Sequence, residues 1–377
     1  MYDVVVLGAG PVGNSAARFC AERGLSALVI EEHGTIGYPV QCAGLLSSAA
    51  FAACGVSDDA VCNEVSGAKI FGSDPEHPLS FDAGETKAYV VDRGVLDRET
   101  AECAAAAGAD YRIKTAAVRV SEDKKCVYTA SGDEIPYRML IAADGPRSIA
   151  ARSFQVPPSP YIYSGIQTEI PYHSDGRQVC LYPQASPDFF AWLIPVSKTR
   201  ARIGLCGTAD VPQRFAAFRR QFGVSTSAEL VTGTIPLGIR KRVCGPSWML
   251  AGDAAGFPKP TSGGGIYTGI RSARHAADTA AEQLDTGDTR TYWTRCREDF
   301  GHELDTGLQL LKFRRSLAAE DIDTIVETLS APALIDIITR YGDMDAPSPL
   351  IRQLLRRPEL LGLAGTGFKG LVRMLFS

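Results

Sequence analysis

The sequence predicts an α/β fold, α+β overall, in which a Rossmann-like domain is combined with an antiparallel sheet and a helical C-terminal region. Three observations lead to this prediction. Residues 4–7 (Val-Val-Val-Leu) form a β-branched run that leads directly into a glycine-rich segment, as in a strand-turn-helix unit. Short apolar runs such as 179–182 and 189–194 are suited to strands of an antiparallel sheet. Residues 291–377 have a mainly helical pattern that prolines divide into short pieces.

Composition and charge are those of a folded globular protein. The chain has 377 residues, of which 45% are hydrophobic and 22% are charged. At roughly 150 residues per domain, this length predicts two to three domains. Lys and Arg number 39 against 43 Asp and Glu, which gives a net charge of −4. This balance argues against a nucleic-acid partner, because such binding depends on neutralising phosphates.

Cysteine usage and the N-terminus predict a cytoplasmic protein without a metal site. The ten cysteines show no CxxC or Cys/His ligand spacing, so we expect no metal ion. The chain begins without the basic and apolar pattern of a signal peptide, so we expect a reducing, cytoplasmic compartment. No apolar run reaches the roughly 18 residues that a membrane span requires.

The N-terminal sixty residues have the spacing of a dinucleotide site. Gly8, Gly10 and Gly13 follow the first strand and open a helix. In such a unit the first glycine permits a tight turn, the second lets a pyrophosphate approach the backbone, and the third lets helix and strand pack closely. The next strand, 27–30, ends at Glu31, whose carboxylate can accept hydrogen bonds from an adenosine ribose.

Two later segments favour FAD over NAD as the dinucleotide. Residues 139–145 end in Asp-Gly, and residues 248–256 end in Gly-Asp-Ala-Ala-Gly, which precedes a glycine-rich helix start. Asp253 at the end of the later strand can hold a ribityl hydroxyl. The N–H groups of the helix start can face the pyrimidine edge of a flavin, where negative charge accumulates on reduction.

Together with the N-terminal unit, these segments resemble the FAD-binding family that contains p-hydroxybenzoate hydroxylase. The resemblance implies FAD as the cofactor, Arg93 near the flavin or its phosphates, and Val118 as the position whose backbone meets the adenine. The residues expected at the cofactor are Gly8, Gly10, Gly13, Glu31, Cys42, Ala43, Gly44, Arg93, Val118, Gly252, Asp253, Pro260, Gly264, Gly265 and Ile266.

Two further segments resemble the geranylgeranyl reductases. Residues 39–47 (Pro-Val-Gln-Cys-Ala-Gly-Leu-Leu-Ser) are similar to the Pro-x-x-Cys-Gly segment of these enzymes, and residues 190–195 (Phe-Ala-Trp-Leu-Ile-Pro) to their Tyr-x-Trp-x-Phe-Pro segment. The resemblance implies a reductase that saturates geranylgeranyl chains of archaeal-type membrane lipids by hydride transfer from N5 of reduced FAD. It implies Cys42 as the catalytic residue, which donates a proton or fixes the substrate and the flavin face. The expected substrate-binding residues are Phe190, Trp192 and Ile194.

The match has departures, and two other functions stay open. Ala43 stands where the family has glycine, Phe190 where it has tyrosine, and Val196 where a lysine often follows the proline. The loss of a phenol at Phe190 and of an ammonium at Val196 makes this wall of the expected pocket more apolar and leaves the identity of the isoprenoid open. A flavin-dependent monooxygenase or halogenase is the first alternative, and this chain has the second half of the halogenase segment Trp-x-Trp-x-Ile-Pro. A flavin-bearing isoprenoid-binding or electron-transfer protein is the second.

The motifs divide the chain into three expected parts. The FAD-binding domain is discontinuous and comprises residues 1–65, 93–150 and 245–290. Residues 66–92 and 151–244 form a substrate domain whose antiparallel sheet covers the flavin. Residues 291–377 form the helical C-terminal region.

Residues 348–377 combine five basic side chains and one acidic side chain with leucine-rich segments. Such segments can lie in an anionic membrane interface, so peripheral membrane contact is one expectation, and a packed helix with solvated arginines is the other. The expected partners are an isoprenoid lipid and an electron donor, which is a ferredoxin, a deazaflavin or NAD(P)H. The donor stays open because FAD takes the one dinucleotide fingerprint.

Overall fold

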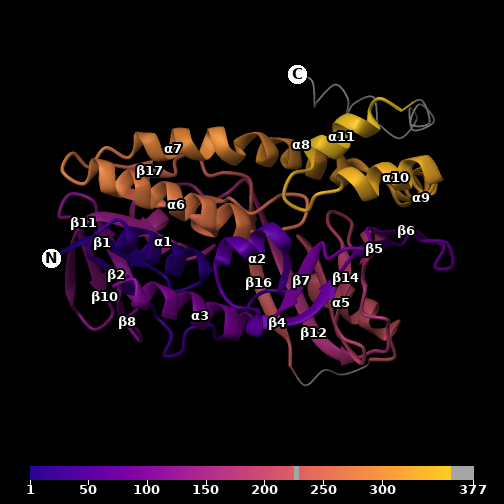
Figure 1. Ribbon diagram of the computed structural model, residues 1–377, viewed down its shortest axis with the longest axis horizontal. Coiled ribbons are helices and arrows are strands. Elements are labelled where there is room, and N and C mark those ends of the chain that lie inside the picture. Colours follow the sequence, from indigo (N-terminus) through magenta and orange to yellow (C-terminus); the bar gives the residue numbers. More distant parts are fainter. Residues whose placement is uncertain (225–228, 358–377) are drawn as a thin grey trace.

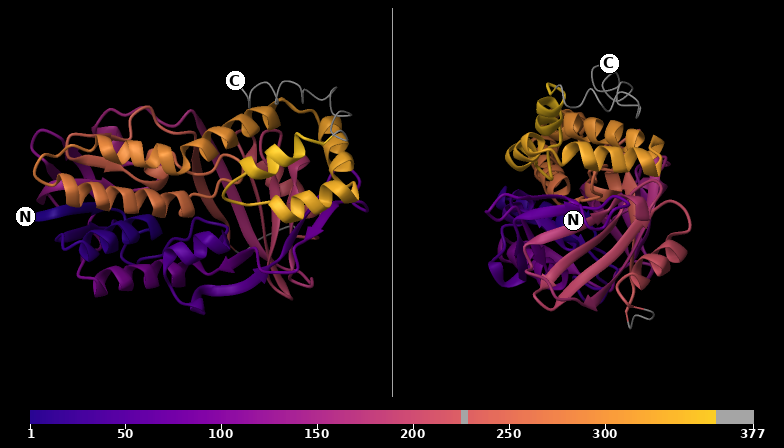
Figure 2. Two further views of the ribbon diagram at one scale, coloured as in Figure 1. Left: turned by 45° about the horizontal axis from the view of Figure 1, so that its top comes forward. Right: turned by 90° about the vertical axis from the view of Figure 1, so that its right-hand side faces the viewer.

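The computed structural model describes residues 1–224 and 229–357, which fold into three sheets and a set of helices (Figure 1). The first sheet lies near the N-terminus, and the second lies at the other end of the molecule. The C-terminal helices run along one side of both sheets (Figure 2). Among the described residues, no helix combines the length and the apolar character needed to cross a bilayer.

The first sheet contains the strands predicted around the glycine-rich segment. Its strands are β1 (Tyr2–Leu7), β2 (Ala27–Ile30), β8 (Asp110–Arg112), β9 (Ala117–Ser121), β10 (Cys126–Thr129), β11 (Glu134–Ala142), β17 (Cys244–Gly245) and β18 (Trp248–Leu250). The order is β17-β18-β11-β1-β2-β8, with β10 and then β9 paired beside β11. The strands from β18 to β8 are parallel. Val4, Val5 and Val6 are fully buried, as an unbroken β-branched run predicts for a central parallel strand.

The parallel strands end together at one edge of this sheet. Leu7 of β1 pairs with Ile30 of β2 and with Ala142 of β11. Ala142 pairs in turn with Leu250 of β18. The turns that carry the predicted motifs therefore leave the sheet side by side. Ligands of open α/β sheets bind outside this carboxyl edge.

Helix α1 holds the glycine turn against the first sheet and contacts both α3 and α6. The helices of this part are α1 (Pro11–Glu22), α2 (Ser48–Cys54), α3 (Arg93–Ala106), α4 (Ile149–Ser153) and α6 (Ile266–Gln283), with the short η1 (Asp58–Ala60) and η3 (Gly252–Ala255). Pro11 stands in the first turn of α1, where its missing N–H leaves no hydrogen bond unmade. Ala16, Phe19 and Cys20 form its buried face.

The second sheet has seven strands and is antiparallel with one exception. Its order is β16 (Val231–Leu237), β12 (Tyr161–Pro171), β15 (Arg200–Gly207), β14 (Ala191–Ser197), β13 (Gln178–Tyr182), β5 (Gly67–Ile70) and β6 (Leu79–Asp82). Only β13 and β5 are parallel. Helix α5 (Val211–Arg220) packs against β12 and β15, and the short η2 (Pro183–Ala185) precedes β14. These observations confirm the predicted fold class.

A small third sheet packs beside β14 of the second sheet. It consists of β3 (Leu45–Ser47), β7 (Ala88–Val91) and β4 (Val61–Val65). Two of these strands lie before residue 66 and one lies after it, so the sheet crosses the boundary predicted there. The three-part division at 1–65, 66–92, 93–150, 151–244, 245–290 and 291–377 stays a prediction.

The described part of the C-terminal region, residues 291–357, is mainly helical, as predicted. It contains α7 (Arg290–Cys296), the π-helical η4 (Arg297–Gly301), α8 (His302–Ser316), α9 (Ala319–Leu329), α10 (Pro332–Tyr341) and α11 (Ser348–Leu354). Leu350 and Leu354 of α11 pack against α10 residues including Leu334 and Ile338. These leucines therefore contribute to the contact between α10 and α11. The rest of the proposed membrane-contacting segment, residues 358–377, lies outside the described residues.

Candidate active site

A cavity of about 1840 Å³ runs from the carboxyl edge of the first sheet to the second sheet. Ordinary small-molecule pockets have volumes of about 300–1,000 Å³, so this one has room for a dinucleotide and a second long ligand. The predicted site residues that line it are Gly8, Gly10, Glu31, Cys42, Ala43, Gly44, Arg93, Asp253, Pro260, Gly264, Gly265, Ile266, Phe190, Trp192 and Ile194. Gly13, Val118 and Gly252 are not among its lining residues.

The three glycines of the first turn have different physical roles. Gly8 has a φ of +90°, which a residue with a side chain rarely adopts. A Cβ on Gly13 would lie 1.9 Å from the carbonyl oxygen of Gly8, so that glycine permits the packing of helix on strand. A Cβ on Gly10 would meet nothing within 4 Å. Gly10 therefore faces open space at the N-terminus of α1, where free N–H groups and the helix dipole favour a phosphate.

Glu31 lies beside this turn with its carboxylate already oriented. One carboxylate oxygen accepts a 2.8 Å hydrogen bond from the backbone N–H of Ala9. The other accepts a 2.8 Å hydrogen bond from the backbone N–H of His33 and lies 2.6 Å from Nδ1 of the same histidine. The side chain is 12% exposed. A carboxylate held in this way keeps lone pairs for further donors, and its contact with an adenosine ribose stays a prediction.

Val118, whose backbone was expected to meet the adenine, does not line the cavity. Its side chain is 53% exposed, whereas Thr115 and Ala117, which precede it, line the cavity. Because side chains alternate along a strand, the side chains of Ala117 and Val118 point to opposite faces of β9. The predicted contact of the Val118 backbone with adenine stays a prediction.

Asp253 lies on η3, immediately beyond β18, and faces the start of α6. Burial raises the pKa of Asp253 to about 6, partly opposed by the positive charge of Arg93. A Cβ on Gly265 would lie 2.5 Å from a carboxylate oxygen of Asp253, so a side chain at this position would displace that carboxylate. Helix α6 begins at Ile266 without a side-chain cap, which leaves its first N–H groups for a ligand.

Arg93 lies beside Cys42. It forms two hydrogen bonds of 2.9 Å with the carboxylate of Asp97 and lies close enough to the Cys42 side chain to interact with it electrostatically. Burial acts to lower the pKa of Arg93, but Asp97 and Cys42 outweigh it and hold that pKa above its usual range. A permanent positive charge is therefore next to the Cys42 sulfur.

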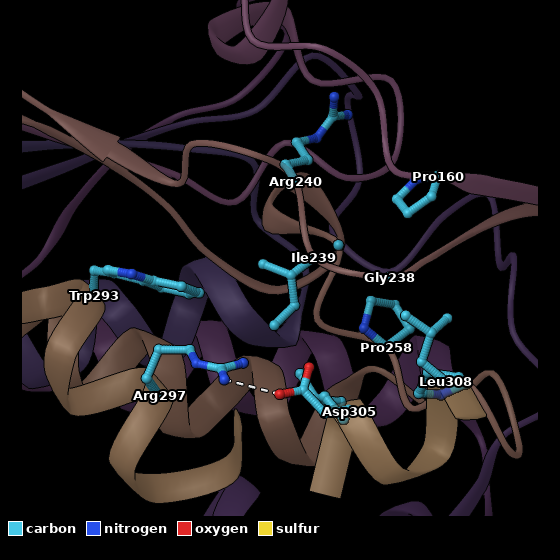
Figure 3. Close-up of a pocket in the computed structure, with 12 residues that line it drawn as sticks. Pro160, Gly238, Ile239, Arg240, Pro258, Trp293, Arg297, Asp305 and Leu308 are labelled. Atoms are coloured by element: carbon cyan, nitrogen blue, oxygen red, sulfur yellow. Dashed lines mark hydrogen bonds and ion pairs between the residues drawn. The ribbon is translucent and has the colours of Figure 1, made fainter. Parts of the chain in front are cut away.

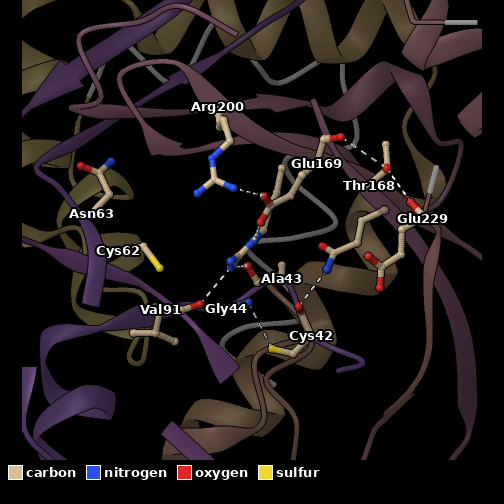
Figure 4. A network of polar contacts seen from close by, with 12 residues as sticks. Cys42, Ala43, Gly44, Cys62, Asn63, Val91, Thr168, Glu169, Arg200 and Glu229 are labelled. Atoms are coloured by element: carbon tan, nitrogen blue, oxygen red, sulfur yellow. Dashed lines mark hydrogen bonds and ion pairs between the residues drawn. The ribbon is translucent and has the colours of Figure 1, made fainter. Parts of the chain in front are cut away.

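The loop that carries Cys42 is held by hydrogen bonds from the second sheet (Figure 4). The backbone N–H of Gly44 donates to Sγ of Cys42 at 3.3 Å. The Gln167 side chain donates to the carbonyl oxygen of Cys42 at 2.8 Å. Nη1 of Arg202 donates to the carbonyl oxygens of Ala43, at 2.9 Å, and Val91, at 3.0 Å. Glu169 fixes that arginine from the other side, through a 2.9 Å bond to Nε.

Cys42 differs from the deeply buried cysteines of this chain. Burial raises the pKa of Cys20, Cys54 and Cys206 to about 12, so these thiols stay protonated. Cys42 is half-buried and lines the cavity. Among the described residues, no group of His, Cys, Asp and Glu side chains is arranged to hold a metal ion.

Aromatic side chains form the wall opposite this loop. Phe189 and Phe190 stack with ring centroids 4.5 Å apart, and the rings of Phe190 and Trp192 lie edge to face at 6.2 Å. The indole of Trp192 lies over Gly204 of the neighbouring strand, where a Cβ would be 2.2 Å from the ring. Strand β14 begins at Ala191, so both phenylalanines precede the strand that was predicted to include them. The result is an apolar chamber next to Cys42.

Three polar residues in or beside the cavity were not among the expected site residues. Asp144 accepts a 2.7 Å hydrogen bond from the backbone N–H of Ile149, and its other oxygen is buried without a partner among the described residues. Burial raises the pKa of this carboxyl. The Asp-Gly turn was the available signal for Asp144. Gln167 and Arg202 gave no signal, because their partners are more than a hundred residues away along the chain.

A second pocket, of about 240 Å³, lies behind the loop that contains Pro258 and Pro260 (Figure 3). Trp293, Arg297 and Asp305 line its other side, and Arg297 donates to Asp305 at 2.8 Å. Pro260 lines both pockets, so this loop separates them.

Sequence comparison finds a matching protein family and relatives that align over most of this chain. Residues 1–297 match the protein family described as FAD binding domain. An uncharacterised protein of Methanocaldococcus jannaschii is 30% identical over 387 residues, which cover 98% of this chain and 97% of the relative. The digeranylgeranylglycerophospholipid reductase of Methanosarcina acetivorans is 28% identical over 365 residues, or 87% of this chain and 88% of that enzyme.

Solved structures give the same result for the fold. A geranylgeranyl bacteriochlorophyll reductase-like protein from Thermoplasma acidophilum superimposes with a TM-score of 0.85 at 25% identity, over 96% of this chain and 99% of that one. A flavin-dependent brominase superimposes with a TM-score of 0.72 at 16% identity, over 94% of this chain and 98% of that one. At that identity, the second comparison shows the fold alone.

Proposed function

Because this chain belongs to the FAD binding domain family and is an FAD-dependent oxidoreductase, we propose that it saturates C=C bonds of geranylgeranyl chains, those of archaeal-type membrane lipids in particular. The observation that carries the proposal is the 1840 Å³ cavity, whose polar glycine-turn end and aromatic end meet at Cys42. The similarity to digeranylgeranylglycerophospholipid reductases over most of the chain supports it.

The cofactor end of the cavity fits FAD in size and in the kind of group it presents. Gly10 and the first turn of α1 would hold the pyrophosphate, and Glu31 the adenosine ribose. Asp253 would accept a hydrogen bond from a ribityl hydroxyl, and the N–H groups near Gly265 would face the pyrimidine edge. Reduced FAD supplies a hydride equivalent at N5.

The aromatic end provides what an unactivated alkene needs. Such a substrate has no carbonyl to spread charge, so rate depends on placing one alkene carbon at the hydride source in a dry chamber. Phe190, Trp192 and Ile194 present apolar surface there. Chains of isoprenoid units match this surface by hydrophobic burial and need no polar partner along their length.

Cys42 would supply the proton for the second alkene carbon. As the hydride bonds to one carbon, the thiol proton bonds to the other, and the thiolate regains a proton from water. The backbone N–H of Gly44 donates to this sulfur at 3.3 Å, and Arg93 interacts electrostatically with the same side chain. Both would stabilise the thiolate formed in the step, because an adjacent cation or an N–H donor favours the charged form.

Mass spectrometry of the product tests the function directly. Dithionite-reduced enzyme and a digeranylgeranyl lipid should give products heavier by two hydrogens for each reduced bond. Unchanged product mass with tight lipid binding would instead indicate an isoprenoid carrier or electron-transfer protein. Oxygen consumption coupled to oxidation or halogenation of a substrate would indicate the monooxygenase or halogenase, which the shared fold with the brominase keeps as an alternative.

The electron donor and the membrane contact each need their own measurement. Anaerobic mixing of the oxidised enzyme with ferredoxin, a deazaflavin or NAD(P)H should bleach the flavin absorbance for the physiological donor alone.

Removal of residues 358–377 should weaken binding to anionic liposomes at low salt if this segment contacts the membrane. Equal binding by both forms would exclude that contact.

A further inference from the structure

The segment between α10 and α11 forms part of the cavity wall. Gly342, Asp343, Met344 and Pro347 line the cavity. The Met344 side chain packs against the apolar cluster that contains Ile194, to which Ala43 and Trp192 also pack. Residues 342–347, here called the wall segment, are more than a hundred residues from these partners in the chain. Sequence reasoning assigned the segment only to the helical region.

A buried ion pair attaches the wall segment to the rest of the cavity. Lys259 and Asp345 form this pair, with side chains 9% and 6% exposed. Nζ of Lys259 also donates to the carbonyl oxygen of Met344 at 2.9 Å. The second carboxylate oxygen of Asp345 accepts a hydrogen bond from the hydroxyl of Ser47.

The partners of Asp345 lie in or next to the two loops that would contact the flavin and the substrate. Lys259 accepts a 2.8 Å backbone hydrogen bond from Gly263 and donates one of 3.0 Å to Gly264. A Cβ on Gly264 would lie 3.6 Å from Nζ of Lys259. Ser47 ends β3, the strand that follows the Cys42 loop. One carboxylate therefore connects the wall segment to both loops.

The other end of the wall segment is also fixed. Glu303 of α8 accepts hydrogen bonds from the backbone N–H and the hydroxyl of Ser348, at 3.0 and 2.5 Å. Asp345 and Ser348 are therefore both fixed, and Met344 is the direct neighbour of Asp345, with its own carbonyl oxygen bound by Lys259.

The energetics favour a geometric role for the ion pair. Removing two charges from water is costly, and well-packed apolar side chains in their place are often equally stable or more stable. An apolar pair, however, lacks the directional hydrogen bonds to Met344 and Ser47. The pair is therefore better explained by the position it enforces than by the stability it adds.

Resting on the proposed function, we propose that Lys259 and Asp345 are positioning residues that hold Met344 against the isoprenoid and set the alkene in register with the flavin. Hydride transfer needs the reacting atoms about 3–3.5 Å apart, and a shift of about 1 Å can cost about 100-fold in rate. The hydrogen bonds of Asp345 link the flavin-side loop to the substrate wall and so reduce such shifts.

The first experiment compares Asp345→Asn and Lys259→Met with the wild type, and uses Asp336→Asn as control. Asp336 forms an exposed ion pair with Arg340 on α10, 3.4 Å long, in the same helical region. We expect the two pair variants to retain FAD and its reduction by dithionite. Their kcat for alkene reduction should fall about 100-fold, and the control should match the wild type. Wild-type kcat in both pair variants would overturn the proposal.

Because a single substitution leaves one buried charge unpaired, a double variant separates folding from positioning. Lys259→Met combined with Asp345→Leu removes both charges and should fold with a melting temperature near that of the wild type. The proposal expects the same large loss of kcat in this variant. Recovery of wild-type kcat would show that the pair has no positioning role.

Limited proteolysis gives a readout that does not depend on turnover. Arg340, two residues before the wall segment, has a side chain 65% exposed. Trypsin should cut after Arg340 at least several-fold faster in the double variant than in the wild type, and a saturated phytanyl lipid should slow the wild-type cut. Equal cutting rates would overturn the proposal. Absence of alkene reduction in the wild type would overturn the proposed function, and the proteolysis result would still test the ion pair.

Discussion

The side-chain amide of Gln167 donates a 2.8 Å hydrogen bond to the carbonyl oxygen of Cys42. The bond joins β12 of the second sheet to a loop that lies 125 residues earlier in the chain. Arg202 of β15 binds the next residue of the same loop, Ala43. The position of the Cys42 thiol is therefore set by the second sheet, and several predictions about activity depend on it.

Substitution of Cys42 separates proton donation from cofactor binding. Cys42→Ala and Cys42→Ser should bind FAD normally, because the loop is held through backbone carbonyl groups. Their turnover should fall about 100- to 10,000-fold, the range for loss of a general acid. Single-turnover oxidation of reduced flavin by a geranylgeranyl lipid measures this step. Full turnover in both variants would remove Cys42 from the mechanism.

Arg202 and Arg200 provide a matched pair of substitutions. Both donate to Glu169, but only Arg202 also donates to Ala43 and Val91. Arg202→Leu leaves two carbonyl groups without their donor, at a cost of about 1–3 kcal/mol in the free energy of unfolding. We expect it to lower kcat about 10-fold or more through movement of the Cys42 loop.

Arg200→Leu removes an ion pair whose arginine side chain is 61% exposed, and exposed pairs contribute about 0–1 kcal/mol. It should leave both kcat and the melting temperature near wild type. Equal loss of kcat in the two variants would show that the hydrogen bonds of Arg202 to the Cys42 loop do not determine the activity.

Substitution by alanine should lower protein stability at Gly13 and FAD affinity at Gly10. Gly13→Ala places a Cβ against the carbonyl oxygen of Gly8, so the cofactor-free protein should lose about 1–3 kcal/mol of stability through overpacking. Gly10→Ala adds a methyl group to open space. It should leave the cofactor-free melting temperature unchanged and weaken FAD binding, because the methyl group occupies the phosphate position. Denaturation curves and fluorescence titration with FAD measure the two effects.

FAD affinity should depend on pH through Asp253. Burial raises the pKa of this carboxyl to about 6, so it gains its negative charge as the pH rises through that value. A ribityl hydroxyl donates best to the ionised form. We therefore expect the dissociation constant of FAD to rise as the pH falls below about 6, with a limit of about tenfold per pH unit.

Asp253→Asn is the control for this pH dependence. The amide does not titrate, so its FAD affinity should be weaker at pH 7 and should lack the change near pH 6. A wild-type affinity that is constant between pH 5 and 7.5 would contradict a role for the Asp253 carboxylate in binding.

Local sequence was sufficient for the parts of the site that each lie within one strand-turn-helix unit. Gly8, Gly10, Gly13 and Glu31 follow from the order of glycines, apolar residues and one acid over about thirty positions. Asp253 and Gly265 follow from a second unit of the same kind. All but Gly13 line the cavity, and the packing of Gly13 against Gly8 explains its absence there.

Residues whose role depends on partners far along the chain were not accessible in this way. Gln167, Arg202, Lys259 and Asp345 are ordinary polar residues in their own segments. Their contacts form only when the second sheet and the C-terminal helices pack against the first sheet.

The sequence by itself determined the fold class, the FAD-binding turn and the resemblance to geranylgeranyl reductases, because periodicity, glycine spacing and short motifs act over a few neighbouring residues. Only the tertiary structure decided which side chains hold the Cys42 loop and which segment closes the apolar chamber. The link between Asp345 and Ser47 spans 298 positions of the chain. Such contacts depend on the packing of whole elements, which local patterns do not specify.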